Sequence, residues 1–394
     1  MKILFTMLCL LFPISAYAVT INAASCSIAH VQAAINAAVH GDVVQLPECS
    51  VTNWTSTNKD NPSVTVTTQR ITIQGVGSGP TGPVTRIKLS STGATSSSTL
   101  IRVNNVQAAG TDIGFTLKDV ILEGGNTGSE QHADQGLYLR ECRNFKIHRN
   151  LFTHLGVGVA AYGSGTTQRG VIYDNRFVQI SRFASPTRGY GIEVNGLAIT
   201  GALSLGTENA VFAENNYFER VRHSIASNNS SRYVFRYNTV KNGTTGSLGN
   251  AHAIDVHGLE SWATGSRSYE VYENNVSNDI DTNRAGVTIR GGDGVIFNNT
   301  LLDATHPIEL RNSPGGAGCS GSYPSTGQIR SLYIWNNTPS TIENDCPSLI
   351  QLNRDYFLSV RPGYTAYPYP HLLRAGDSPG ITPNPPTIFH VTPL

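Results

Sequence analysis

Acidic, basic and imidazole side chains recur at matching places in a series of short related segments between positions 136 and 311. The third and fifth residues of these segments are mostly polar, and they include Glu193, Asp255, His257, Arg290 and Glu309. An imidazole can take up or donate a proton near neutral pH, a carboxyl group can act as an acid or a base in catalysis, and a guanidinium can neutralise an anion. A cluster of this composition could carry out acid–base chemistry on a bound ligand.

The position just before each segment adds a second set of ionisable groups. His223, His252 and His306 all occupy it, although the chain has only 11 histidines, and Tyr190 stands there in another copy. Arg188 and Arg284 lie nearby. The residues expected to contact a ligand from this face are Arg222, Arg311, Arg140, Tyr138, Tyr162, Tyr190, Asn195, Asn228 and, in an inserted loop, Trp262.

The segments that carry these residues alternate apolar and polar positions with a period of two, which is typical of strands with one buried face. Their second and fourth residues are apolar or small and are expected to point inward. The seven copies are 136–140, 158–162, 191–195, 224–228, 253–257, 286–290 and 307–311. The third and fifth residues therefore share one exposed face.

Each segment is followed by a second motif, apolar-x-x-Asn-x-apolar. Its asparagines are Asn150, Asn175, Asn215, Asn238, Asn274, Asn299 and Asn337, and Val120 stands in an earlier copy without Asn. Short strands cannot bury their apolar faces alone, but stacked repeats can, so the repetition predicts a solenoid. Each Asn fits a turn position from which it can bond the backbone of the next repeat.

Both ends of the chain differ from the repeats. The apolar run after Lys2, followed by Ala16-Tyr17-Ala18, predicts a signal peptide over 1–18. We expect one domain over 19–375, with a capping helix at about 27–40, and a Pro-rich tail over 376–394. The protein is then secreted, to the periplasm or the medium.

Composition and cysteine usage narrow the class further. The formal net charge is +1 over 394 residues. The chain therefore lacks the excess positive charge expected of a protein that binds nucleic acid or an anionic membrane. No segment after the signal peptide is long and apolar enough to span a membrane. Cys26–Cys49 and Cys319–Cys346 are the expected disulfides, with Cys142 left as a buried thiol.

With these repeats, the chain resembles the pectin-lyase-like superfamily of right-handed parallel β-helices. The resemblance rests on Val31-Gln-Ala-Ala-Ile35, on Gly41-Asp-Val-Val-Gln-Leu-Pro47 and on the Asn-ladder repeats, and covers about residues 26–360. It implies an all-β solenoid and a polysaccharide ligand, because members include polysaccharide lyases, hydrolases, epimerases and phage tailspikes. The chain departs from the polygalacturonase pattern, because the motifs Asn-Thr-Asp and Asp-Asp do not occur in the expected order. We expect a monomer.

The first functional hypothesis is a polysaccharide lyase acting on a uronate-containing polymer. β-Elimination needs a neutralised carboxylate, a base for the α-proton and an acid for the leaving oxygen. Arg290, Arg311 and Arg222 could neutralise; His257, His252 or His223 could serve as the base, oriented by Asp255. Tyr138, Tyr162 and Trp262 could stack on sugar rings.

Two other hypotheses use the same face. An inverting glycoside hydrolase would pair Glu193 with Asp255, or Asp255 with Glu309, which lie two coils and so about 9–10 Å apart. A non-enzymatic glycan-binding protein would use the face for binding alone. No cofactor is required by the sequence; if the site takes Ca²⁺, Asp255 and Glu193 are its expected ligands, and a transition-metal site would draw on His252, Asp255, His257 and His223.

Overall fold

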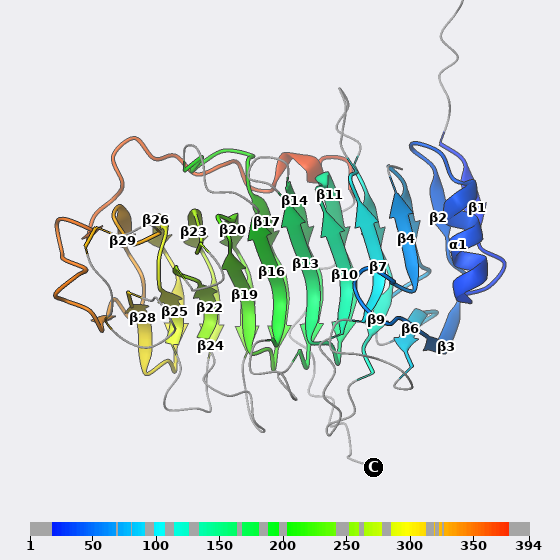
Figure 1. Cartoon of the computed structure of the whole chain (residues 1–394), viewed down its shortest axis with the longest axis horizontal. Helices are drawn as coiled ribbons and strands as arrows, with labels where there is room; N and C mark the ends of the chain where they lie inside the picture. Colours follow the sequence, from blue (N-terminus) through cyan, green and yellow to red (C-terminus); the bar gives the residue numbers. More distant parts are fainter. Residues whose placement is uncertain are drawn as a thin grey trace, which may run out of the picture.

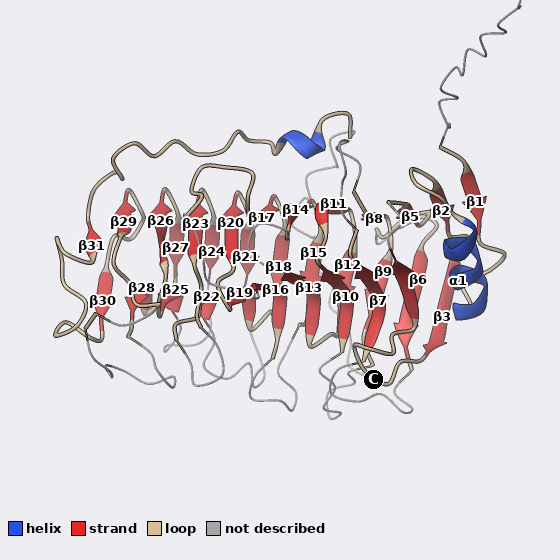
Figure 2. Ribbon diagram, turned by 45° about the horizontal axis from the view of Figure 1, so that its top comes forward, coloured by secondary structure: helices blue, strands red, loops and turns tan. Residues whose placement is uncertain are grey.

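Each sequence repeat folds into one coil that contributes one strand to each of three parallel sheets. The computed structural model describes residues 18–67, 70–79, 81–90, 98–106, 114–125, 134–163, 168–180, 188–196, 203–241, 252–259, 264–277, 285–312, 319, 323–324 and 327–377. Successive coils pair strand to strand in parallel (Figure 1, Figure 2). The predicted parallel β-helix is confirmed, with three strands per coil. The predicted signal peptide, residues 1–18, lies outside the described residues except for Ala18.

The first strand of a typical coil belongs to a sheet that has ten strands among the described residues, here called the ten-stranded sheet. Its strands are β4 (Val64–Thr67), β7 (Thr99–Asn104), β10 (Gln135–Arg140), β13 (Val157–Gly163), β16 (Tyr190–Gly196), β19 (His223–Asn228), β22 (His252–Val256), β25 (Ala285–Ile289), β28 (His306–Leu310) and β30 (Ile342–Asn344). This is the sheet built from the predicted polar–apolar segments.

The other two strands of each coil complete the wall. The twelve-stranded sheet of the described residues holds β1 (Thr20–Asn22), β2 (Val43–Gln45), β5 (Thr72–Gln74), β8 (Thr116–Lys118), β11 (Arg143–His148), β14 (Arg169–Tyr173), β17 (Val211–Glu214), β20 (Arg232–Arg236), β23 (Ser268–Tyr272), β26 (Asp293–Phe297), β29 (Leu332–Trp335) and β31 (Tyr356–Phe357). The nine-stranded sheet, counted likewise, holds β3 (Cys49–Trp54), β6 (Thr85–Leu89), β9 (Ile121–Glu123), β12 (Leu151–Thr153), β15 (Arg176–Val178), β18 (Tyr217–Glu219), β21 (Thr239–Lys241), β24 (Asn275–Ser277) and β27 (Thr300–Leu302).

An asparagine ladder runs through the turns between the twelve-stranded and nine-stranded sheets. The backbone N–H and Nδ2 of Asn150 donate to Asn175 Oδ1 at 3.1 and 3.0 Å, and Asn175 Nδ2 donates back to the carbonyl of Ile147 at 2.7 Å. The same pattern repeats to Asn337. Val120 occupies the ladder position of the earlier coil, where its N–H donates to Asn150 Oδ1. The ladder satisfies turn backbone that would otherwise be buried without partners.

One member of the predicted ladder is wrong by one residue. The ladder asparagine of the β17 coil is Asn216, not Asn215, because Ala213 pairs with Ile172 and so takes the inward position. Phe212, the apolar residue at the start of the motif that was assigned to Asn215, faces outward and is covered by Tyr367 and His371. Asn215 instead adopts the left-handed turn conformation, with φ 55°, that precedes each ladder asparagine.

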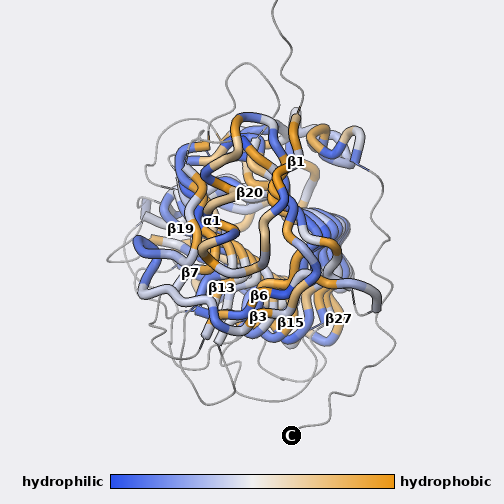
Figure 3. The backbone as a smooth tube through the Cα atoms, turned by 90° about the vertical axis from the view of Figure 1, so that its right-hand side faces the viewer, coloured by the Kyte–Doolittle hydropathy of each residue, from blue (hydrophilic) through white to orange (hydrophobic). Residues whose placement is uncertain are grey.

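The N-terminal end of the core is closed by α1 (Ile28–Ala37), which lies inside the predicted range of about 27–40. The Ser27 side chain caps its first turn by accepting from the His30 N–H, and Val31, Ala34 and Ile35 face the core. Figure 3, viewed from this end, shows α1 in front of the stacked coils. The helix ends at Ala37 because Ala38 is extended. Strand β1 precedes the helix, so the strands begin before α1.

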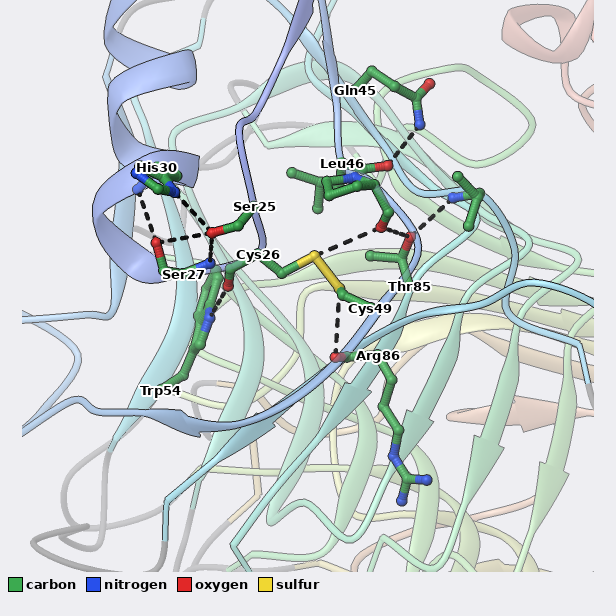
Figure 4. Close-up of a disulfide and its surroundings, with 12 residues drawn as sticks. Ser25, Cys26, Ser27, His30, Gln45, Leu46, Cys49, Trp54, Thr85 and Arg86 are labelled. Atoms are coloured by element: carbon green, nitrogen blue, oxygen red, sulfur yellow. Dashed lines mark hydrogen bonds between the residues drawn. A yellow bond between two sulfur atoms is a disulfide. The ribbon is translucent and has the colours of Figure 1, made fainter.

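Both predicted disulfides form. Cys26–Cys49 ties the segment before α1 to the start of β3, and the Trp54 indole donates to the Cys26 carbonyl at 2.8 Å (Figure 4). Cys319–Cys346 joins two segments near the other end. Two disulfides favour folding in an oxidising compartment. Cys142 is a free thiol among the described cysteines, and burial raises its pKa to about 12, which keeps it unreactive.

The last described segment, residues 361–377, runs back across the outer face of the twelve-stranded sheet, and we call it the strap (Figure 1, Figure 2). Tyr364 donates to Glu270 on β23 at 2.5 Å, and Arg374 donates to Glu214 on β17 at 3.0 Å. Asp377 accepts from Lys146 on β11 at 2.9 Å. The strap therefore bonds to coils that are far apart along the solenoid. Residues 378–394 of the predicted tail lie outside the described residues.

Two histidines buried on this face should make the protein acid-sensitive. Burial lowers the pKa of His148 to about 3 and that of His371 to about 4. Because the unfolded chain binds these protons near pH 6.5, the free energy of unfolding should fall as pH drops from about 6.5 toward 4, by at most about 1.4 kcal/mol per histidine per pH unit. Urea unfolding at pH 7, 5.5 and 4.5 measures this. The His148→Gln/His371→Gln variant should lose less stability over the same range; an unchanged slope would contradict the assignment.

Candidate active site

The strand register of the ten-stranded sheet brings the predicted polar residues into two outward rows. Glu193, Ala226, Asp255, Thr288 and Glu309 pair in sequence across β16 to β28 and form the first row. The second row contains Tyr162, Asn195 and Asn228, which pair in the same way, and continues past the end of β22 to His257. The apolar positions between them, such as Ile225 and Ile254, lie in the core.

A pocket of about 190 Å³ lies on this face at Ala226. Ala226 stands in the first row between Glu193 and Asp255, and its small side chain leaves space there that a larger residue would fill. The pocket is lined by Tyr162, Arg188, Tyr190, Glu193, Asn195, Ala226, Ser227, Asn228 and His257. Six of the sequence-predicted site residues thus share one pocket.

Asp255 is a buried carboxylate that organises the side of the site next to the pocket. Arg290 binds it in a bidentate manner, with Nη2–Oδ2 at 2.9 Å and Nε–Oδ1 at 3.2 Å, and His257 Nε2 lies 2.9 Å from Oδ2. Burial alone would raise the pKa of Asp255, but Arg290, followed by His257 and His223, holds it well below its usual range. Asp255 is therefore an anion that accepts hydrogen bonds.

This arrangement fixes the tautomer of His257. Its Nε2 faces an ionised carboxylate and must carry the proton, so Nδ1 is the basic nitrogen. Nδ1 is buried and has no hydrogen-bond partner within the described part of the chain. An oriented imidazole with an unused basic nitrogen, on a residue that lines the pocket, is the arrangement a general base requires.

The other two predicted histidines lie beside this group rather than in the pocket lining. His223 is fully buried, with Nε2 3.6 Å from Asp255 Oδ2, and burial lowers its pKa well below the usual value. His252 stacks on His223, with ring centroids 5.6 Å apart, and burial lowers its pKa to about 4. Both are held neutral near pH 7. His223 packs beside Asp255 and His252 packs on His223, so both lie next to the site and outside the pocket lining.

Opposite His257, the pocket holds a second polar group. The Tyr162 hydroxyl donates to Glu193 Oε1 at 2.5 Å, and Arg188 Nη1 lies 4.0 Å from Glu193 Oε2. Arg188 Nη1 and Glu193 Oε2 are buried without hydrogen-bond partners among the described residues. Burial raises the pKa of Tyr190 to about 12, so its phenol stays protonated at neutral pH.

The remaining predicted residues have other contacts. Glu309 is bound by Arg311 and accepts from Thr288 at 2.9 Å, while Arg311 also binds Asp345 at 2.9 Å. Arg222 donates to the Arg188 carbonyl at 3.0 Å and lies over the Tyr190 ring. These guanidinium groups are engaged within the protein, as Arg290 is.

The aromatic residues predicted to stack on sugars also differ in position. Tyr138 is buried, with Arg102 over its ring and Tyr162 at 5.1 Å, so its ring supports Tyr162 rather than facing a ligand. Arg140 is exposed. Trp262 and Arg284 lie outside the described residues.

No group of three or more His, Cys, Asp or Glu side chains in the described ranges is arranged to hold a metal ion. Asp255, one of the two expected calcium ligands, has both oxygens bound by Arg290. Glu193, the other, lies across Ala226 from it. The side chains present therefore do not fit a shared Ca²⁺ site.

Sequence reasoning noted Arg188 only as a neighbour, yet it lines the pocket. It lies outside the period-two segments, directly before Gly189 and β16, so the repeat pattern gave it no register. The available signal was its position two residues before Tyr190, because Tyr190 occupies the column that holds histidines in other coils.

No family model matches the chain, and no curated protein sequence matches it significantly. Among solved structures it is similar to the alginate lyase from Paenibacillus sp. str. FPU-7, with a TM-score of 0.49 and 14% identity over 83% of this chain and 97% of that one. It is also similar to the catalytic unit of the thermostable GH87 α-1,3-glucanase from Streptomyces thermodiastaticus strain HF3-3, with a TM-score of 0.43 and 13% identity over 82% of this chain and 59% of that one. No helix in the described ranges is long and apolar enough to cross a membrane.

Proposed function

We propose that this protein is a secreted polysaccharide lyase that cleaves a uronate-containing polymer by β-elimination in the Ala226 pocket. The observation that carries the proposal is His257: its Nε2 is bound to ionised Asp255, and its Nδ1 has no hydrogen-bond partner among the described residues. An imidazole held in this way is suited to removing an α-proton near neutral pH.

The remaining roles follow from the pocket wall. Arg188 is the guanidinium that lines the pocket, and its buried Nη1, which has no hydrogen bond among the described residues, would bind the uronate carboxylate. Tyr190 remains protonated because burial raises its pKa to about 12, so it can donate to the leaving oxygen. Glu193, which already accepts from Tyr162, would accept from a sugar hydroxyl.

The elimination step then balances as follows. His257 Nδ1 takes the proton from the carbon next to the carboxylate, and the electron pair of that C–H bond forms the new C=C bond. The bond to the leaving glycosidic oxygen breaks, and that oxygen takes the Tyr190 proton. Return of the proton from His257 to Tyr190 through solvent restores the site.

The hydrolase alternative is less well supported by the same geometry. An inverting hydrolase needs one carboxylic acid and one free carboxylate on either side of the bond. Asp255 is bound by Arg290 and kept ionised, and Glu309 is bound by Arg311. Among the residues described as lining the pocket, Glu193 is the single carboxylate.

A substrate panel tests the proposal. Protein with intact disulfides would be incubated with alginate, polygalacturonate, hyaluronan and neutral glucans, with calcium or with EDTA. Ultraviolet absorbance of unsaturated uronate and new reducing ends should rise together on at least one acidic polymer. Reducing ends without absorbance would indicate a hydrolase. Silence in both assays, with binding on a glycan array, would indicate a binding protein.

A pocket-filling variant ties any activity to this site. Ala226→Leu adds bulk at the centre of the pocket and removes no polar group, so it should abolish turnover while leaving the melting temperature near that of the wild type. Full activity in a folded Ala226→Leu protein would place the active site elsewhere.

A further inference from the structure

We infer that Asn229 is a positioning residue that orients the Asn195 amide so that its N–H groups point toward the pocket. The wall of the pocket formed by Asn195 and Asn228 is then suited to bind a carboxylate. The inference rests on the proposed function and deepens it, because it names the group of the substrate that this wall recognises. Asn229 directly follows β19, in the left-handed region with φ 47°, which asparagine tolerates better than most residues.

The orientation of the Asn229 amide is fixed by a donor that cannot reverse. The backbone N–H of Thr264 donates to Asn229 at 3.1 Å, so the atom it meets must be the oxygen, Oδ1. The other end of the Asn229 amide is then Nδ2, which donates to Asn195 at 2.8 Å. The accepting atom of Asn195 must therefore be its Oδ1.

With Oδ1 of Asn195 engaged by Asn229, the Asn195 amide has its Nδ2 donors left for the pocket, which Asn195 lines. Asn228 is oriented in the same sense by a different bond, since the backbone N–H of Asn229 donates to Asn228 Oδ1 at 2.9 Å. Two adjacent amides in the second row thus present N–H groups. The Asn195 orientation depends on the Asn229 side chain, whereas that of Asn228 depends on its backbone.

A wall of donors is complementary to an anion and a poor match for a group that must itself donate. Arg188 adds a guanidinium to the same pocket. When the α-proton of a uronate is removed, negative charge moves onto its carboxylate oxygens, and fixed N–H donors stabilise that charge. The substrate carboxylate is therefore expected to lie against Asn195 and Asn228.

Asn229→Asp is the variant that tests this role. An aspartate has nearly the same shape, still accepts from the Thr264 N–H and tolerates the left-handed backbone, but it cannot donate to Asn195. The Asn195 amide should then reverse and point its oxygen at the pocket. We expect kcat/KM on the most active polyuronate to fall by about 10- to 100-fold, with an unchanged melting temperature.

Two further variants separate positioning from the added charge. Asn229→Gly suits the backbone and removes the side chain without charge, and it should cause a smaller loss than Asn229→Asp. In an Asn195→Ala background, Asn229→Asp should have little further effect, because the residue through which it acts is gone. An equal loss in both backgrounds would overturn the inference, as would wild-type kcat/KM in the Asn229→Asp protein.

Failure of the proposed function would look different. If the wild type is inactive on every polyuronate, binding of glucuronate and of methyl glucoside is measured by calorimetry for the wild type and Asn229→Asp. Weaker glucuronate binding in the variant, with methyl glucoside unaffected, would still support the role of Asn229. Equal glucuronate binding in both proteins, or none in the wild type, would refute it.

Discussion

Replacing His257 with alanine is expected to lower kcat on the active polyuronate by about 10²- to 10⁴-fold, the usual contribution of a general base. The variant removes the basic nitrogen and leaves the Asp255–Arg290 pair intact, because that pair is bidentate without His257. The loss should appear in kcat more than in KM, since the imidazole acts on the proton in transfer. Steady-state kinetics by ultraviolet absorbance measure it.

His306→Ala is the matched control. His306 lies on the same sheet face in the same column as His252, but it pairs with Glu343 and is absent from the pocket lining. It should retain wild-type kcat. If His257→Ala kept full activity while folded, or if His306→Ala lost as much, the base would have been assigned to the wrong residue.

The period-two pattern predicted the rows of the site because strand geometry alone decides which face a residue takes. Glu193, Asn195 and His257 needed no further information to be placed on one face. The pattern failed where tertiary cover changes the meaning of an apolar residue. The motif aligned Phe212 with the first apolar position because Phe212 is apolar, yet it faces outward and is covered by Tyr367 and His371 of the strap.

The partners of the charged residues could not be predicted in the same way. In the sequence pattern Arg290, Arg311 and Arg222 are equivalent free cations. In the structure, the length and conformation of each side chain determine which carboxylate or carbonyl it binds. Arg290 reaches across to Asp255, and Arg311 reaches back to Glu309. These pairings turn two expected substrate ligands into support for the site and leave Arg188 as the guanidinium in the pocket lining.

Replacing Arg236 with methionine is expected to lower the free energy of unfolding by about 3–5 kcal/mol, the usual loss when one partner of a buried ion pair is removed. Arg236 is fully buried on β20, and each of its guanidinium nitrogens is bonded. Nε and Nη2 bind Glu214, Nη1 donates to the Tyr272 hydroxyl and the Tyr367 carbonyl, and Nη2 also donates to the Pro368 carbonyl. The urea midpoint measures the loss.

The reason for so large an effect is that one residue joins three coils, those of β17, β20 and β23, to the strap. Without the guanidinium, Glu214 remains a buried charge with fewer partners, and two strap carbonyls lose their donors. Lys59→Met is the contrasting control, because Lys59 pairs with Asp60 where both side chains are largely exposed, and such pairs contribute about 1 kcal/mol or less.

A second substitution separates the charge from the packing. Glu214→Gln added to Arg236→Met removes the stranded anion, so the double variant should recover part of the stability that Arg236→Met loses. If the double variant were as unstable as the sum of the two single variants, the loss would come from the strap carbonyls and the packing of β20. If Arg236→Met and Lys59→Met lost equally little, the strap would not depend on this ion pair. Because solenoid coils otherwise contact only their neighbours, the strap would then be held to distant coils mainly through the bonds of Tyr364, Arg374 and Asp377.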